Sequence, residues 1–516
     1  MHAVVAIPPI NDFYFTPHRF SSLGAEVLCN ILAGNGLKVS FENFPLYFNK
    51  GRSIDFAKGL EYLNQYIIHQ EMGKLSYFTK YQRFGPSIEE CAAIVASQSP
   101  HLCFISCFAY SYSIQTLELA GAIKRLQPQI TVIVGGAGPT AYPLYFIKDP
   151  AIDFILAGES EVTVRSFINA FIYKSIRYEQ VPNFYWKEKG DIKCSPLKKW
   201  TEPEDIKVVF SKPWIQKRTI SFSTTLTRGC SKACRFCSNF ITHGTTFRTA
   251  PLGTIKQAVN ELSIPEHSDD SGIVFNFEDD NLLLNPNFFL QVIDILKDKY
   301  GKISLLAENG IDYSLLSTNI VDRLIGAGMA QFNISLASID ATILKKEHRS
   351  IELSHYQSII RSIAKYKIPS ITYFICGFKD DTKESVVNTL SFLYAQPTAI
   401  GISLYYAIPG IGNFENPATF DALPPYLCNG SSAYPWNGSL STSTMITAFR
   451  LSRLCNLMKQ NNHSSLEKEI LTLIQAERKL YTFIKTPKGC VITPVENSDN
   501  ELVEMFFQSI TAGVSL

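Results

Sequence analysis

Charged side chains are scarce in this sequence. They make up 18% of its 516 residues, against about 25% in an average soluble domain, and 48 basic against 46 acidic residues leave a net charge of +2. No run of lysine and arginine stands out that would follow a phosphate backbone, so we expect no nucleic-acid partner. Hydrophobic residues make up 46%, which argues against a disordered chain and favours a compact protein of roughly three domains.

The sequence also lacks an unbroken apolar segment of the roughly 20 residues that a spanning helix needs. Residues 385–414 contain no charge, but Pro397, Pro409 and polar side chains divide them into a short helix and a short strand. The first ten residues lack the basic segment of a signal peptide. We therefore expect a cytoplasmic protein without a transmembrane segment, whose twelve cysteines are thiols or metal ligands rather than disulfides.

The first third of the chain alternates short β-rich apolar runs with helical patterns. Such alternation predicts a parallel sheet with helices on both faces, and ligands bind such sheets beyond the carboxyl ends of the strands. The predicted strands are 3–7, 38–42, 103–107, 131–134 and 154–156, and the loops expected to converge are 8–19, 108–113, 135–140 and 158–161.

A second alternating series follows a predicted hairpin at Lys189-Gly190 and a linker rich in Lys, Glu and Pro. Six strands are two short of an eight-stranded barrel, so the series predicts a partial barrel. These strands are 220–226, 273–278, 303–308, 331–336, 370–376 and 400–406, and helices are expected later at 444–459 and 466–485.

The predicted fold class is therefore α/β. A Rossmann-like, doubly wound domain occupies residues 1–180 and a linker with a hairpin occupies 181–215. A partial (βα)6 TIM-like barrel follows at 216–415, and a small helical C-terminal domain at 416–516.

Three of the cysteines are clustered. Cys230, Cys234 and Cys237 form a Cys-x3-Cys-x2-Cys pattern after the first strand of the second series, at the face where βα barrels hold their active sites. Three thiolates hold three irons of a cubane cluster and leave the fourth iron open to another ligand. Arg228 and Arg235 nearby favour the thiolate forms.

Two alternatives to an iron-sulfur cluster stay open. One is a zinc site that uses His243 as a fourth ligand, although structural zinc sites usually pair two cysteine knuckles and the sequence has no second one. The other is chance clustering of the three cysteines.

The cysteine spacing, together with Phe236 before the last cysteine, resembles the radical S-adenosylmethionine (SAM) superfamily. The resemblance implies a 4Fe-4S cluster whose open iron binds SAM, and one-electron cleavage of SAM to a 5'-deoxyadenosyl radical. It also implies contacts to SAM from Asp279 and Asp280 near the methionine moiety, from Ser335 near the ribose and from Gly377 near the adenine. For the two aspartates a solvated loop or a helix cap is the alternative, and no residue is assigned to catalysis.

The first domain resembles the cobalamin-binding domain that precedes the radical domain in one large subgroup. Ser106 and the pair Gly135-Gly136 follow that domain's Ser-x-Leu and Gly-Gly pattern, and residues 158–161 resemble its Gly-Glu-x-Glu segment. Ser106 at a strand end would meet the nucleotide tail, and the glycines would leave room for it. The Asp-x-His-x-x-Gly signature is absent, so a scaffold without cobalamin is the alternative, and a replacement ligand would be sought in His18.

The resemblance implies a cobalamin-dependent radical SAM enzyme that methylates an unactivated carbon of a small molecule, lipid or peptide. Its partners would be that substrate and a low-potential electron donor such as flavodoxin or ferredoxin. A radical enzyme that rearranges, cyclises or oxidises its substrate without methyl transfer is the first alternative. An iron-sulfur electron carrier or sensor is an alternative of another class.

Overall fold

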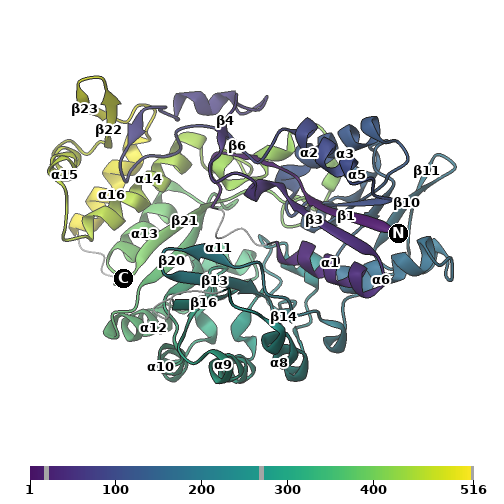
Figure 1. Cartoon of the computed structure of the whole chain (residues 1–516). Coiled ribbons are helices and arrows are strands. Elements are labelled where there is room, and N and C mark those ends of the chain that lie inside the picture. The colour runs from purple at the N-terminus through teal and green to yellow at the C-terminus, as the bar shows by residue number, and fades with distance from the viewer. Residues whose placement is uncertain (17–21, 266–271, 513–516) are drawn as a thin grey trace.

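The computed structural model describes residues 1–16, 22–265 and 272–512. Two α/β units lie side by side, each made of sheets and the helices that cover them, and we call them the first and the second layer. The C-terminal helices pack against the second layer on the side away from the first (Figure 1). No helix within these described ranges is long and apolar enough to cross a membrane.

The first layer is a seven-stranded sheet with the order β11-β10-β9-β8-β7-β1-β3. The five strands predicted for this part all form, and they pair in parallel: β1 (His2–Ile7), β3 (Lys38–Asn43), β7 (Leu102–Ser106), β8 (Thr131–Gly135) and β9 (Phe154–Leu156). The predicted hairpin around Lys189-Gly190 also forms, and its strands β10 (Phe184–Glu188) and β11 (Asp191–Cys194) extend this sheet in antiparallel fashion.

Alternate residues of β1 face opposite cores, as a doubly wound sheet requires. Ala3 and Val5 pack with helices α1 (Leu23–Gly34) and α6 (Ser160–Phe171). Val4 and Ala6 pack on the other face with α2 (Ile88–Ser97) and α3 (Ser113–Leu126). Both faces are therefore covered by helices, and the carboxyl ends of the strands stay available for a ligand.

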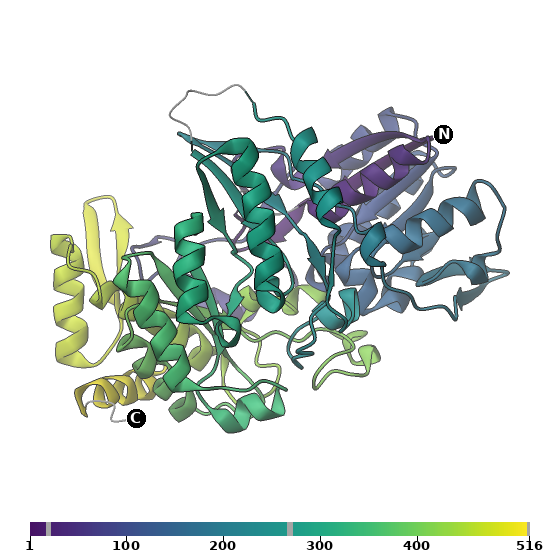
Figure 2. The ribbon, with the colours of Figure 1, turned by 90° about the horizontal axis from the view of Figure 1, so that it is seen from below.

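The second layer contains the six parallel strands of the second series in two sheets. Its outer helices form the largest core with the strands, whereas the inner faces turn toward the first layer (Figure 2). One sheet has the order β12-β13-β16-β17 and the other the order β18-β19-β20-β21. The bounds are β12 (Trp214–Gln216), β13 (Thr219–Thr224), β16 (Gly272–Phe277), β17 (Ile303–Leu306), β18 (Ile311–Asp312), β19 (Phe332–Ala337), β20 (Ser370–Cys376) and β21 (Ala399–Leu404). That these strands close into a partial barrel stays a prediction.

The helices outside these sheets are amphipathic and turn their apolar stripes to the strands. In α10, for example, Val321 and Leu324 are fully buried. These helices are α8 (Leu252–Glu261), α9 (Pro286–Tyr300), α10 (Thr318–Ala327), α12 (Leu353–Lys365) and α13 (Lys383–Tyr394).

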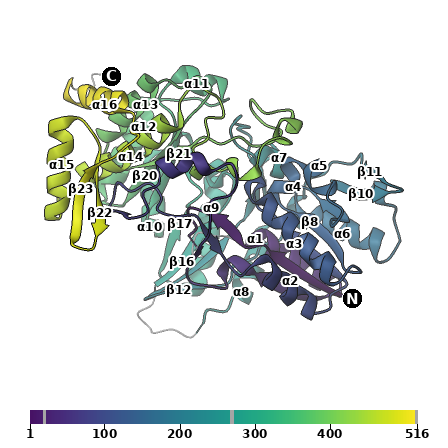
Figure 3. The ribbon, with the colours of Figure 1, turned by 90° about the horizontal axis from the view of Figure 1, so that it is seen from above.

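The C-terminal region corrects one prediction. The helix expected over 466–485 ends at Glu477, because Arg478 adopts a left-handed backbone with φ 55°. A hairpin of β22 (Tyr481–Thr486) and β23 (Gly489–Pro494) follows and lies beside α15 (Ser465–Glu477) (Figure 3). The other helices of this region are α14 (Thr442–Met458) and α16 (Asn500–Ala512). β22 also pairs with β5 (Glu71–Met72), so a segment of the N-terminal part of the chain belongs to this region.

Candidate active site

The three clustered cysteines lie in one loop between β14 (Thr227–Arg228) and α7 (Asn239–His243). Cys234 is buried, whereas Cys230 and Cys237 are half-buried. Burial, together with the neighbouring thiols of Cys234 and Cys230, raises the pKa of Cys237 to about 12, so the three sulfurs lie in one region. Such thiols ionise when a metal takes them as ligands.

The cysteine loop fits a cubane cluster better than a single metal ion. Within the part of the chain that the structure describes, no three His, Cys, Asp or Glu side chains are placed to hold one ion. A cubane instead takes one thiolate per iron, which three thiols along one loop supply. His243, the fourth ligand of the zinc alternative, contacts Glu159 Oε1 through Nδ1 at 3.1 Å.

The two aspartates hold the backbone that leads into the cysteine loop. Asp279 is 4% exposed, and its Oδ1 accepts hydrogen bonds from the amides of Leu226 and Thr227 at 2.9 and 2.7 Å. Asp280 Oδ2 accepts one from the amide of Gly229 at 2.8 Å. Asp279 is therefore neither solvated nor a helix cap, and that alternative is wrong for this residue.

The pKa of Asp279 also departs from its usual value. Burial raises its pKa to about 6, although its hydrogen bonds to Thr227 and Leu226 act in the opposite direction. Its second oxygen, Oδ2, is buried and has no hydrogen-bond partner among the described residues. This oxygen is suited to accept a hydrogen bond from a bound ligand, because a buried acceptor without a partner costs free energy.

Phe236 lies in the cysteine loop, Ser335 lies in β19, and Gly377 directly follows β20. The Phe236 ring is 5.5 Å from that of Phe378. Gly377 has φ +113° and donates its amide to Asp381 Oδ2 at 2.8 Å. The ring contact thus brings Phe236 to the segment that contains Gly377.

An arginine links the ribose segment to the cysteines. The carbonyl of Ser335 accepts a hydrogen bond from Arg349 Nη2 at 2.6 Å. Burial raises the pKa of Cys234, and the guanidinium of Arg349 lowers it against that trend. Arg349 is a site residue that the sequence reasoning missed, since it lies 115 positions beyond Cys234 and belongs to no short motif.

A cavity of about 330 Å³ lies where the two layers meet, within the range of about 300–1,000 Å³ typical of small-ligand sites. Ser106, Gly135 and Gly136 line it from the first sheet, as predicted loop ends should. Arg228 and Asp280 line it from the second layer. A cofactor held on the first sheet would therefore face the residues that lead to the cysteines, and the cavity fits the nucleotide part of such a cofactor. His18 lies outside the described residues.

The glycine pair also allows close packing within the first sheet. A Cβ on Gly136 would lie 2.5 Å from the carbonyl oxygen of Cys107, and one on Gly135 would lie 3.0 Å from that of Leu156. That these Cβ atoms would also fill the ligand's space stays a prediction. The glycines allow neighbouring strands to approach closely, and Gly136, at φ +107°, also allows the sharp turn.

The Gly-Glu-x-Glu segment joins the two layers through buried ion pairs. Both oxygens of Glu159 accept hydrogen bonds from Arg248, at 2.9 and 3.0 Å, and Glu161 accepts one from Arg228 at 3.0 Å. Burial raises the pKa of Glu159, but hydrogen bonds from His243 and Arg248 outweigh it and lower the pKa to about 2. Buried carboxylates need such partners. The Gly-Glu-x-Glu segment was the signal in the sequence that pointed to these two glutamates.

Comparison with protein-family models matches residues 224–393 to the radical SAM superfamily and residues 79–168 to the B12 binding domain. The two matches fall on the two layers that meet at the cavity. The chain contains a radical SAM domain and a B12-binding domain. The radical SAM domain implies a 4Fe-4S cluster and SAM, and the B12 domain implies cobalamin.

The chain is also similar in sequence to named proteins. It is 25% identical over 289 residues to the bacteriochlorophyllide d C-12(1)-methyltransferase of Chlorobaculum tepidum, covering 55% of this chain and 59% of that protein. It is 22% identical over 295 residues to the anaerobic magnesium-protoporphyrin IX monomethyl ester cyclase of Synechocystis, covering 55% and 57%. The chain thus matches less than two thirds of the length of these relatives.

Solved structures share the fold of this radical SAM protein. The radical SAM methyltransferase TsrM from Kitasatospora setae, with cobalamin and a [4Fe-4S] cluster bound, superposes with a TM-score of 0.58 and 14% identity over 80% of this chain and 76% of that one. The cobalamin-dependent SAM radical enzyme OxsB, with aqua-cobalamin and SAM bound, gives 0.55 and 12% over 76% and 52%. At this identity the likeness concerns the fold.

Proposed function

We propose that this protein is a cobalamin-dependent radical SAM methylase that acts on an unactivated carbon of a small molecule, lipid or peptide. The observation that carries the proposal is the cavity shared by the two domains. Ser106 lines it from the B12 domain, and Asp280, which holds Gly229 beside Cys230, lines it from the radical SAM domain. Methyl transfer to a substrate radical requires the methyl source and the radical source to face one space, and a cavity lined by both domains supports such an arrangement.

Each part of the chain has a separate task in this proposal. When bound, the cluster and SAM supply the radical that removes a hydrogen atom, and cobalamin supplies a methyl group. Cys230, Cys234 and Cys237 hold the cluster, while Asp279 and Asp280 fix the loop that carries them. The surroundings of the cavity keep the domains in register, because the Glu159 and Glu161 ion pairs cross from one domain to the other.

The remaining predicted contacts keep their proposed roles. Gly377 borders the space for the adenine, Ser335 borders that for the ribose, and Phe236 contacts the cofactor from the cysteine loop. Ser106 receives the cobalamin tail. A low-potential donor such as flavodoxin or ferredoxin delivers the electron that starts each reaction.

A second candidate function uses the same radical without methyl transfer. The Synechocystis relative is named a cyclase, which favours rearrangement, cyclisation or oxidation as the alternative outcome. An electron carrier or sensor is disfavoured, because it has no use for a cavity between two cofactor domains.

The test measures two products of SAM. Anaerobically purified protein is incubated with hydroxocobalamin, a strong reductant and SAM. A methylase releases both 5'-deoxyadenosine and S-adenosylhomocysteine, since SAM serves as radical source and as methyl donor. 5'-Deoxyadenosine alone would support the second candidate, and neither product despite a full cluster would support an electron carrier. Cys234→Ala should abolish 5'-deoxyadenosine, whereas Cys455→Ala, in the core of α14, should not.

A further inference from the structure

A cavity of about 240 Å³ lies between an N-terminal segment of the chain, the end of β21 and α14. None of the predicted site residues lines it. Among the described residues that do, Asp12 is the only charged one. Asp12 ends the short strand β2 (Ile10–Asp12), in the loop region that the sequence placed beyond the first strand, and is only 5% exposed. The cavity thus contains a buried carboxylate to which no role has been assigned.

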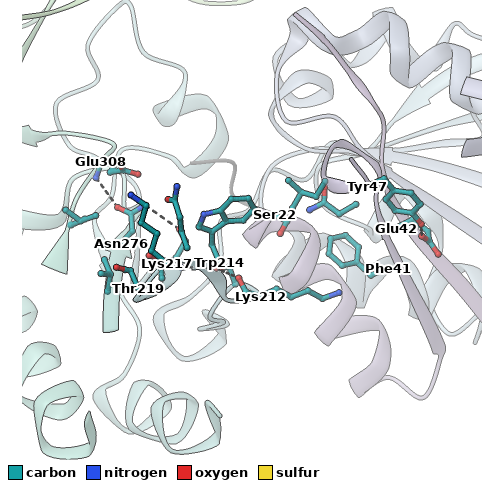
Figure 4. Close-up of a pocket in the computed structure, with 18 residues that line it drawn as sticks. Ser22, Phe41, Glu42, Tyr47, Lys212, Trp214, Lys217, Thr219, Asn276 and Glu308 are labelled. Atoms are coloured by element: carbon teal, nitrogen blue, oxygen red, sulfur yellow. Dashed lines mark hydrogen bonds between the residues drawn. The ribbon is translucent and has the colours of Figure 1, made fainter. Parts of the chain in front are cut away.

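A larger cavity, of about 600 Å³, carries charges of both signs instead. It extends between the first layer, which contributes Phe41 and Tyr47, and the second layer, which contributes Thr219 and Asn276 (Figure 4). Two lysines and two glutamates line it, so its charge favours neither an anion nor a cation. The cavity around Asp12 carries one negative charge in its lining and therefore favours a cation.

Four hydrogen-bond donors surround the Asp12 carboxylate. Its Oδ1 accepts hydrogen bonds from the amide of Phe13 at 2.6 Å and from Ser431 Oγ at 2.8 Å. Its Oδ2 accepts them from Tyr112 Oη at 2.7 Å and from Asn429 Nδ2 at 2.6 Å. Burial raises the pKa of Asp12, and these hydrogen bonds act in the opposite direction. A carboxylate that accepts at all four positions is suited to its ionised form, which has no proton to donate.

The charge of Asp12 has no counter-charge among the residues that the structure describes. All four of its hydrogen-bond partners are neutral groups. The guanidinium of Arg453 is not in the lining: it lies 4.4 Å from the centre of the Phe449 ring and donates to the carbonyl of Ser76. Because an ionised carboxylate away from water is stabilised by a cation beside it, a positively charged ligand would fill this role.

The polar end of the cavity offers a hydrogen-bond acceptor to a ligand. Because the hydroxyl of Ser431 donates its proton to Asp12, the Ser431 oxygen has only lone pairs left. The backbone of Ser431 is held in place, since its carbonyl accepts from Tyr77 Oη at 3.0 Å and its amide donates to Asn429 Oδ1 at 3.2 Å. A ligand group at this oxygen must therefore be a donor, and the carboxylate behind it favours a charged donor, an ammonium group.

Aromatic residues connect this cavity to both cofactor sites. Tyr406 lines it, and the charge of Cys237 acts together with burial to raise the pKa of Tyr406, so this wall lies near the cysteine loop. Tyr112, which donates to Asp12, has its ring 4.8 Å from that of Phe108, and Phe108 lines the cavity assigned to cobalamin. A ligand in this cavity would therefore have the radical source and the methyl source nearby.

We propose that this cavity binds an ammonium group of the substrate, which donates to Ser431 Oγ and is stabilised by the carboxylate of Asp12. The inference rests on the proposed function and names its substrate class, an amine with an apolar body. Tyr14, Tyr406 and Phe449 supply apolar and aromatic surface for the carbon atoms next to the nitrogen. The reacting carbon of such a substrate lies on the side of Tyr406, toward the cysteine loop.

The test uses three probes with one phenyl ring: 2-phenylethylamine, the uncharged 2-phenylethanol and the anion 3-phenylpropanoate. Their dissociation constants are measured by titration calorimetry. We expect the amine to bind at least about tenfold more tightly than the other two. Asp12→Asn keeps the size of the side chain and should remove this preference, whereas Ser431→Ala should weaken the amine about threefold, as expected of one hydrogen bond.

A fourth probe identifies the source of the ammonium group, because a lysine side chain of a peptide carries the same group as a small amine. Nα-acetyl-lysine amide that binds as tightly as 2-phenylethylamine would indicate a peptide. Weaker binding of this probe would indicate a small molecule.

The controls separate the amine site from general charge and from folding. Asp55→Asn removes an exposed carboxylate outside the cavity and should change the affinity of no probe. Ser403→Phe fills the cavity from β21 and should block all three phenyl probes, while circular dichroism stays that of the wild type. Equal binding of amine and alcohol, or an amine preference that Asp12→Asn and Ser431→Ala both leave intact, would overturn the proposal. Amine binding that Ser403→Phe leaves intact would do so as well.

The wild-type preparation is also assayed for 5'-deoxyadenosine and S-adenosylhomocysteine release. Absence of both products with selective amine binding would refute the proposed function and leave the amine site standing. Release of both products without selective amine binding would refute only the amine site.

Discussion

The buried carboxylate of Glu159 gives the sharpest quantitative prediction. Its side chain is fully buried and contacts Arg248 with both oxygens, while the amide of Thr201 donates a third hydrogen bond to it at 2.6 Å. Glu159→Gln keeps the size of the side chain and removes its charge. The guanidinium of Arg248, 8% exposed, would then lose its counter-charge in a buried place.

The size of the effect follows from the pKa. A decrease from 4.5 to about 2 corresponds to about 3 kcal/mol at 1.36 kcal/mol per unit, in the range measured when one partner of a buried ion pair is removed. Because the pKa of Glu159 in the folded protein is below its usual value, this stabilisation is complete above pH of about 4.5 and is lost as the pH falls toward 2.

Urea denaturation of the cofactor-free protein measures this difference. We expect Glu159→Gln to lower the free energy of unfolding by about 3 kcal/mol at pH 7 and by about half as much at pH 3. The control Glu202→Gln, an exposed carboxylate near the same loop, should change it by less than about 0.5 kcal/mol. A pH-independent difference, or one below about 1 kcal/mol at pH 7, would refute the account of this ion pair.

Three further predictions concern the cluster, the aspartate and the glycine turn. Cys230→Ala, Cys234→Ala and Cys237→Ala should each lose the about four irons per chain that the anaerobically purified wild type holds, measured by iron analysis; zinc in place of iron would contradict the cluster. Asp279→Ala should lower the free energy of unfolding, measured by urea denaturation, by about 1–3 kcal/mol, because buried donors lose their acceptor. Asp279→Asn keeps an acceptor oxygen and should lower it by less. Gly136→Ala should lower the melting temperature, whereas Gly24→Ala, in open space on α1 beside the same cavity, should leave it unchanged or raise it.

Local patterns are sufficient to predict the strands and the cysteine loop. The strands follow runs such as Val4 to Ala6 that alternate between two cores, and the cysteines lie within eight residues of one another. The strand pattern and the cysteine spacing are both local, because each lies within the segment whose structure it predicts.

The rest depends on contacts between distant segments. Glu159 meets Arg248 across 89 residues, and β22 pairs with a strand about 410 positions earlier, so neither partner marks the other in the sequence. The helix prediction for 481–485 overlooked local strand formers, Tyr481, Thr482 and Ile484, whereas the pairing of this segment with Glu71 and Met72 is invisible in the local sequence. The close approach of Gly136 to Cys107 likewise appears only when β7 and β8 are side by side.

Cobalamin binding in the cavity between the domains is the central claim, and reconstitution tests it directly. Wild-type protein incubated with hydroxocobalamin and passed through a desalting column should retain about one cobalamin per chain, measured by its visible absorbance. Ser106→Leu places a larger side chain in the cavity and should prevent retention while leaving the iron content unchanged; Ser97→Leu, on the exposed end of α2, should retain as much as the wild type. A wild type without cobalamin, or a Ser106→Leu protein that holds it as well as the wild type, would contradict the account.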